Sequence, residues 1–169
     1  MLQLEQRGQV GSKRRSLMVE TARFTELVEA VDENDQKKLD SLLRQLRESG
    51  HSVPSILEQN IVGQTPLLHY VCKTHRQNLD MVKYLLDQGC NINTSSQEGT
   101  PLLIACRVGA VELVKMLLDN GAQIVTEDEM DVEKSPFYVA SLMGHYEILK
   151  ALMLHQPSMS DIIDPLGEM

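Results

Sequence analysis

Cysteine and histidine side chains are the groups in this sequence that could bind a metal or act as a nucleophile. Cys72 and His75 are separated by two residues, a spacing found in zinc sites, and His69 lies three residues before Cys72. Zinc sites generally take four ligands in two such pairs, and the sequence offers no second pair. We therefore interpret Cys72 as a small core residue and His75 as a loop residue, and we expect no metal or cofactor.

The other cysteines, Cys90 and Cys106, bring the total to three with no regular spacing. Cys106 lies among small residues and is predicted to be in the core, whereas Cys90 follows a helix-ending glycine and is predicted to be partly buried. A reactive thiol is the alternative. The N-terminal residues lack the apolar segment of a secretory signal, so free thiols in a reducing compartment are expected: the cytoplasm, or the nucleus as well.

Charge is distributed unevenly along the chain. The net charge of −8 disfavours nucleic acid and anionic membranes as partners, and the one basic cluster, residues 13–15 before Ser16, suggests a kinase site or part of a nuclear signal. A stretch of acids is accompanied by a single basic residue, Lys134. This pattern predicts either a solvated loop or a binding site for a basic segment of a protein partner. The acids of this stretch are Glu127, Asp128, Glu129, Asp131 and Glu133.

The composition favours helices and shows no sign of catalysis. Aromatic residues make up 4% of the chain, and tryptophan is absent, which disfavours a β-sandwich or barrel. The sequence contains no run of about 18 apolar residues, so no membrane-spanning helix is expected. Neither a phosphate-binding glycine loop nor a strained nucleophile turn is found. We predict a non-catalytic protein.

The most informative feature is an internal repeat. Thr65-Pro66, Thr100-Pro101 and Ser135-Pro136 begin three segments at intervals of 35 residues, and Leu85 to Cys90 matches Leu117 to Ala122. Each segment predicts a short first helix that begins at the proline and a second, amphipathic helix. Gly109 and Gly144 end the first helix of two segments, and Gly89 and Gly121 end the second helix of two segments. A weaker copy places Thr25 on Thr100 and Asn34 on Gly109. One such unit cannot bury both of its faces, so the copies are expected to stack.

The order of features in the repeated segment resembles an ankyrin repeat. These features are Thr-Pro-Leu, a first helix rich in small residues, a glycine, the second helix of residues 112–118 and a closing Asn120-Gly121-Ala122. The resemblance implies an all-α solenoid of stacked antiparallel helix pairs with short hairpin-like loops. We predict a polar segment (1–20), an ankyrin-repeat domain (21–157) and a C-terminal tail (158–169). The domain is divided into a cap (21–62) and repeats at 63–97, 98–132 and 133–157.

Two departures from the repeat pattern mark special regions. Three extra residues fall between positions 73 and 78, which predicts an added helical turn or a longer inter-helix loop. The connection after the second repeat is also three residues longer, and it carries the acidic stretch. The usual histidine of the family's Thr-Pro-Leu-His motif is replaced by Leu68, Leu103 and Tyr138.

The resemblance implies that partners bind the concave face, which is built from loops and from the ends of the first helices. An exposed Leu-Met pair beside an aromatic residue would form an apolar contact there, unless the tail covers it. The leading hypothesis is an adaptor, scaffold or inhibitor that binds a protein and is itself monomeric. The alternative is self-association through the C-terminal unit. Outside the acidic stretch, the candidate binding residues are Lys73, Arg76, Gln97, Glu98, Arg107, Val108, Tyr138, Leu142 and Met143.

Overall fold

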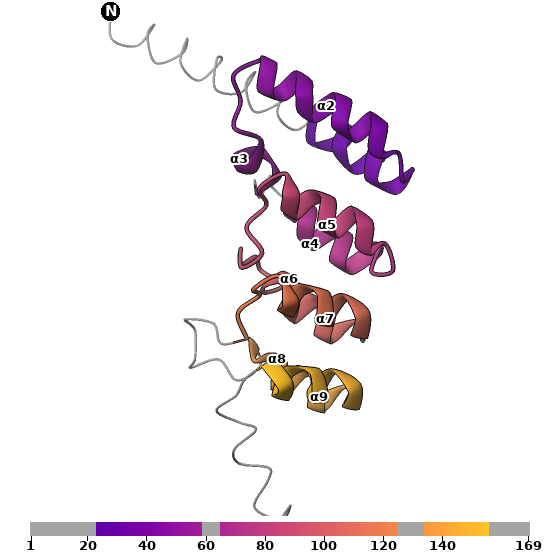
Figure 1. The fold of residues 1–169 in the computed structure, drawn as a ribbon, viewed down its shortest axis with the longest axis vertical. Coiled ribbons are helices and arrows are strands. Elements are labelled where there is room, and N and C mark those ends of the chain that lie inside the picture. The colour runs from indigo at the N-terminus through magenta and orange to yellow at the C-terminus, as the bar shows by residue number, and fades with distance from the viewer. Residues whose placement is uncertain (1–22, 59–64, 125–133, 156–169) are drawn as a thin grey trace, which may run out of the picture.

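The computed structural model describes residues 23–58, 65–124 and 134–155, and these residues form stacked helix pairs (Figure 1). Residues 23–32 are helical and precede α2 (Gln36–Glu48) and the short α3 (Val53–Leu57). The following pairs are α4 (Leu67–Thr74) with α5 (Leu79–Asp87), α6 (Pro101–Arg107) with α7 (Val111–Asp119), and α8 (Pro136–Leu142) with α9 (Tyr146–His155). The described residues contain no β-strand, and the predicted all-α solenoid of stacked helix pairs is confirmed.

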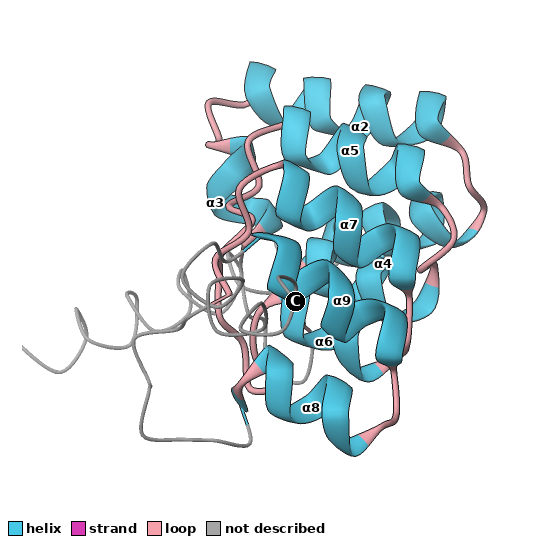
Figure 2. Cartoon of the chain, turned by 60° about the horizontal axis from the view of Figure 1, so that its bottom comes forward, coloured by secondary structure: helices cyan, strands magenta, loops and turns pink. Residues whose placement is uncertain are grey.

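The helices lie in two layers. We call the first helix of each pair, namely residues 23–32, α4, α6 and α8, the inner helices, and α2, α5, α7 and α9 the outer helices. Within the stack α4 packs on α6, α6 packs on α8, and α7 packs on α9. The views in Figures 1 and 2 show the outer helices in one row beside the inner ones. Every pair therefore completes the core of its neighbour.

Local chemistry sets the ends of the inner helices. The Thr100 hydroxyl accepts a hydrogen bond from the Leu103 amide at 3.3 Å, and Pro101 occupies the first helical position, where its missing N–H costs nothing. At the other end Gly109 has φ of +71°, a conformation that side chains disfavour. Asn34 has φ of +52° at the equivalent place in the cap, which confirms that asparagine replaces glycine there.

One continuous core runs through the stack. It extends from Phe24 to Leu152 and includes Leu117, which is fully buried. Cys72 and Cys106 lie in this core, as predicted. Cys90 is 8% exposed, so it is more deeply buried than its position after a glycine had suggested.

The structure refines three details of the predicted repeat. Between α4 and α5 the extra residues are shared, because α4 ends two residues later than the repeat register requires and the following turn, 75–78, is one residue longer than 108–110. Pro66 precedes α4 as its N-cap, so the expectation that proline takes the first helical position is wrong there. The helix α3 was not anticipated within the cap.

Candidate protein-interaction surface

The three cysteine side chains are buried in the stack, and the histidines of the first full repeat contact separate partners. Burial raises the pKa of each of the three thiols to about 12. His69 is 1% exposed and its Nε2 contacts the Gly99 carbonyl oxygen at 3.1 Å, whereas His75 Nε2 lies 2.8 Å from Asp32 Oδ1. Within the described ranges, no group of three or more His, Cys, Asp or Glu side chains is placed to hold a metal ion.

A polar cluster joins the cap to the first full repeat. The Tyr70 hydroxyl donates a hydrogen bond to Asp32 Oδ1 at 2.7 Å, and His75 contacts the same oxygen. Partial burial alone would raise the pKa of Asp32, but the hydrogen bonds from His75 and Tyr70 outweigh it and hold this pKa below its usual range. The turn of Asn78 is tied to the cap as well, because its Nδ2 donates to Asn34 Oδ1 at 2.6 Å.

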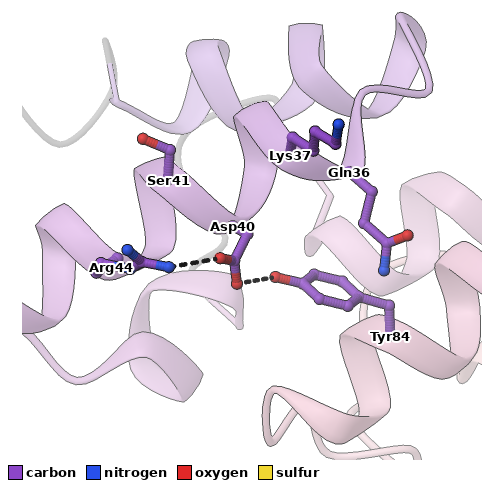
Figure 3. A pocket seen from close by; sticks show the side chains of 6 residues that line it. All are labelled: Gln36, Lys37, Asp40, Ser41, Arg44 and Tyr84. Carbon is purple, nitrogen blue, oxygen red and sulfur yellow. Dashed lines mark hydrogen bonds and ion pairs between the residues drawn. The ribbon is translucent and has the colours of Figure 1, made fainter.

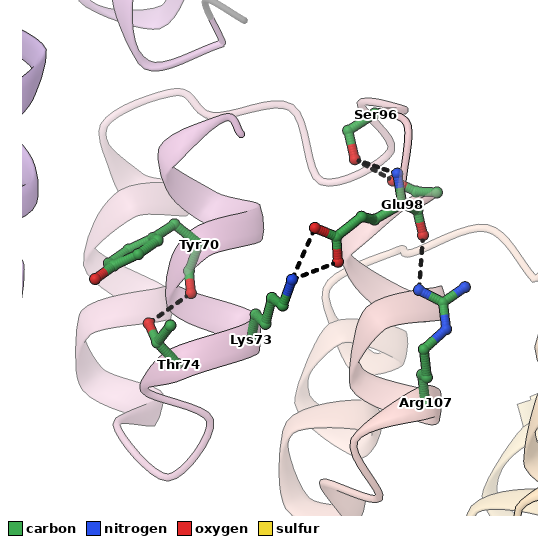
Figure 4. Close-up of polar contacts among 7 residues, drawn as sticks. Tyr70, Lys73, Thr74, Ser96, Glu98 and Arg107 are labelled. Carbon is green, nitrogen blue, oxygen red and sulfur yellow. Dashed lines mark hydrogen bonds and ion pairs between the residues drawn. The ribbon is translucent and has the colours of Figure 1, made fainter. Parts of the chain in front are cut away.

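A second polar cluster joins the two middle repeats (Figure 4). Lys73 Nζ lies 2.8 Å from Glu98 Oε1, and Arg107 Nη1 donates to the Glu98 backbone carbonyl at 3.2 Å. The turn that carries Glu98 is closed by Ser96, whose backbone exchanges hydrogen bonds with Gly99. Three predicted binding residues are therefore brought together, and Gln97 lies exposed in the same turn.

The last inner helix presents apolar side chains instead. Because α6 and α8 have the same length and lie 35 residues apart, their positions can be compared directly. Leu142 is 65% exposed at the position of the exposed Arg107, and Met143 is 49% exposed at the position of Val108. Tyr138 differs, since it is 39% exposed where Leu103 is 1% exposed.

This comparison separates two surfaces. Tyr138 is uncovered because no further repeat stacks on α8 within the described chain, so it belongs to the end of the stack. Met143 occupies a position that is also accessible, at least in part, at Lys73 and Val108. The position of Leu142 is exposed at Arg107 but buried at Cys72. Leu142 and Met143 therefore lie at the end of the inner helix, whereas Tyr138 lies on the end of the stack, and the three residues do not form one uniform patch.

Arg76 and Val108 meet at a groove between the turns of two repeats. Its volume is about 470 Å³, and Leu79, Ala110 and the acidic Glu112 also line it. Gly109 borders the groove, and a Cβ atom at this position would lie 2.8 Å from the His145 ring. The ring therefore lies against the Gly109 backbone and connects the groove to the turn that carries Met143.

The outer helices form a separate polar groove of about 530 Å³ between α2 and α5 (Figure 3). Asp40 is its common acceptor, because the Tyr84 hydroxyl donates to Oδ1 and Arg44 Nη2 lies near Oδ2, each at 3.1 Å. Burial and the bond to Asp40 raise the pKa of Tyr84 to about 12. These contacts make the groove a polar junction between the cap and the first repeat.

Sequence reasoning found most of these residues but missed their partners. It did not foresee that Asp32 accepts bonds from two residues of the next unit or that Arg76 and Val108 line one groove. The three-residue insertion was the signal, since it lengthens the turn that supplies His75 and Arg76. Glu127, Asp128, Glu129 and Asp131 lie outside the described residues.

Comparison with known proteins identifies the class to which this fold belongs. The family model for ankyrin repeats in three copies matches residues 27–128, and the chain belongs to the ankyrin-repeat family. Ankyrin repeats are generally non-catalytic modules that bind other proteins.

The chain is similar in sequence to several known proteins. Dauer abnormal formation protein 25 of Caenorhabditis elegans is 26% identical over 138 residues, which cover 80% of this chain and 32% of that protein. A putative E3 ubiquitin-protein ligase, XBAT34 of Arabidopsis thaliana, is 34% identical over 56% of this chain and 25% of its own length. Protein fem-1 homolog A-like of Mus musculus is 31% identical, with 57% and 14% covered. This chain thus spans about a third or less of the length of these relatives.

Among the described residues, no helix has both the length and the apolar character needed to cross a membrane.

Proposed function

We propose that this chain is a non-catalytic adaptor, scaffold or inhibitor that binds another protein through the C-terminal ends of its inner helices and the turns that follow them. The observation that carries the proposal is the exposure of Leu142 and Met143 on positions that face the inner surface rather than the end of the stack. Burial of an exposed leucine or methionine contributes about 1.5–3 kcal/mol, so the pair offers a substantial anchor. Flexible methionine side chains also suit adaptable binding surfaces.

The neighbouring residues give this anchor a polar border. Arg107 is exposed on the adjacent inner helix, and arginine is enriched among residues that dominate binding energy. Val108 and Arg76 continue the surface along the turns. We further propose that the protein works in a reducing compartment, the cytoplasm or the nucleus, a proposal supported by its three buried free thiols.

Self-association through the end of the stack is a second candidate function. It is favoured by the exposure of Tyr138 and by Leu154, which is 72% exposed on α9. Light scattering over a range of concentrations separates the two proposals, because self-association raises the mean mass with concentration. The substitution Tyr138→Glu would abolish that rise, whereas Leu142→Glu would leave it unchanged.

Site-specific photo-crosslinking tests the main proposal. A photoreactive amino acid placed at Met143 should join the chain to a protein partner in an extract, whereas the same group at Leu154 should not. Unlabelled chain should compete for this partner, and unlabelled Leu142→Glu should compete at least tenfold less well. Equal crosslinking from both positions, or equal competition by the variant, would contradict the proposed surface.

A further inference from the structure

We infer that the bound segment of the partner is acidic beside an apolar anchor, with its carboxylates on Arg76 and Arg107 and the anchor on Leu142 and Met143. This inference rests on the proposed function and specifies the chemistry of the partner. It follows from which charges of the inner surface are already matched within the chain.

Two acids at the cap end of the inner surface are engaged in intramolecular contacts. Asp32 accepts bonds from Tyr70 and His75, and the neighbouring Glu33 lies 2.7 Å from Lys38 Nζ. A basic segment would have to compete with these contacts to bind Asp32 or Glu33. These two acids are therefore poor binding sites for an external cation, although Glu29 on the same helix is exposed.

The basic residues in the middle of the surface are only partly neutralised by carboxylates of the same chain. Lys73 is paired with the Glu98 carboxylate, but Arg107 bonds only to the backbone carbonyl of Glu98, which carries no net charge. Within the described part of the chain, neither Arg107 nor Arg76 lies within ion-pair distance of a carboxylate. Two exposed guanidinium groups thus remain available, and their planar donors favour carboxylate oxygens.

The cations and the apolar pair are linked through neighbouring turns. Arg76 and Val108 share a groove that Glu112 also lines, and Arg107 precedes Val108 in the chain. The His145 ring lies beside Gly109, and His145 follows Met143 by two residues. Packed helices are about 8–10 Å apart, and an extended segment rises about 3.3 Å per residue. A carboxylate about three residues from an apolar anchor would therefore reach Arg107 while the anchor contacts Leu142.

Selection from a phage-displayed random peptide library tests this inference directly, because the library samples both signs of charge and needs no purified partner. The intact chain and the variant Arg107→Glu are used as separate targets. Lys115→Glu is the matched control, because Lys115 is exposed on the outer helix α7 and its substitution makes the same change in charge. Circular dichroism checks folding, and Arg107→Gln is a milder second variant.

Peptides selected on the intact chain should be enriched in aspartate or glutamate close to a large apolar residue. Their affinity, measured by fluorescence anisotropy, should fall at least tenfold with Arg107→Glu, fall less with Arg107→Gln and stay unchanged with Lys115→Glu. Peptides selected on Arg107→Glu should instead be enriched in lysine or arginine.

Other outcomes are decisive as well. Peptides that need Leu142 but carry basic residues or no charge preference would overturn this inference and leave the proposed function intact. Peptides insensitive to both Leu142→Glu and Arg107→Glu, or the absence of any selected binder, would overturn both.

Discussion

Asp32, Arg107 and Leu142 occupy equivalent positions at the ends of three inner helices, yet their surroundings differ. Asp32 is held by two residues of the next unit, and Arg107 is held by one bond to a backbone carbonyl. Leu142 is 65% exposed. The inner surface therefore changes along the stack from internally matched polar groups to an accessible apolar pair.

The difference shows that the last residue of an inner helix can have one of two roles in a repeat protein: it can join neighbouring units, or it can remain exposed for a partner. In the N-terminal half the position links two units through polar contacts, and the cap has Glu26 and Glu29 where the second full repeat has Pro101 and Ile104. In the C-terminal half the units pack through their buried residues, and the same position is left available for a partner. Four comparisons within the chain test this division, beginning with the largest expected effect.

The first comparison sets a buried leucine against an exposed one. Leu117→Ala should lower the free energy of unfolding by about 2–5 kcal/mol, because Leu117 is fully buried and its truncation leaves a cavity. Leu142→Ala should change it by less than about 0.5 kcal/mol. Urea denaturation measures both. A comparable loss for Leu142→Ala would mean that this side chain is structural and would weaken the binding proposal.

The second comparison concerns the turns after the inner helices. Gly109 and Gly144 have similar positive φ angles, but only a Cβ atom at 109 would clash with a neighbour, the His145 ring. Gly144→Ala should cost about 1 kcal/mol from backbone strain, and Gly109→Ala about 2 kcal/mol because the ring must also move. Thermal unfolding of both variants checks the order, and equal losses would contradict the contact with His145.

The sequence predicted the repeated parts of this molecule far better than the parts that break the repeat. Thr100-Pro101, Asn34 and Gly109 act locally, so their residue types alone indicated where the helices begin and end. The partners of Asp32 and the path of the insertion depend on the relative placement of two units, which a linear pattern does not contain. The exposure of Leu142 was expected because the resemblance placed it at the end of a first helix, whereas α3 had no counterpart elsewhere in the chain.

The third comparison uses two histidines with opposite pKa shifts. Burial lowers the pKa of His69 below 6.5, so its contribution to stability is present above pH 6.5 and is lost as the pH falls towards its folded pKa. A bond to the Ala151 carbonyl and another to Asp119 raise the pKa of His155, so its contribution is present below pH 6.5 and is lost as the pH rises through its folded pKa. His69→Gln should flatten the acidic side of the stability profile, and His155→Gln should flatten the other side. Urea midpoints measured across the pH range check both signs.

The fourth and smallest comparison concerns ion pairs. The Lys73–Glu98 pair joins two repeats, whereas Arg44–Asp40 lies within α2, and both are substantially exposed. A double-mutant cycle with alanine at both positions should give about 0.2–1 kcal/mol for the first pair and about 0.3–0.5 kcal/mol for the second. Added salt should reduce both coupling energies. A value well above this range for Lys73–Glu98 would indicate that the pair is a major link between repeats.

The most direct test of the central claim compares two exposed leucines in binding. Leu142 lies on the inner helix α8 and Leu154 on the outer helix α9, and the same substitution by glutamate can be made at each. The partner identified by crosslinking is purified in its free form for calorimetry. The dissociation constant should increase at least tenfold with Leu142→Glu, equivalent to about 1.4 kcal/mol, and should not change significantly with Leu154→Glu. Equal effects of the two substitutions, or a loss of affinity only with Leu154→Glu, would contradict the account.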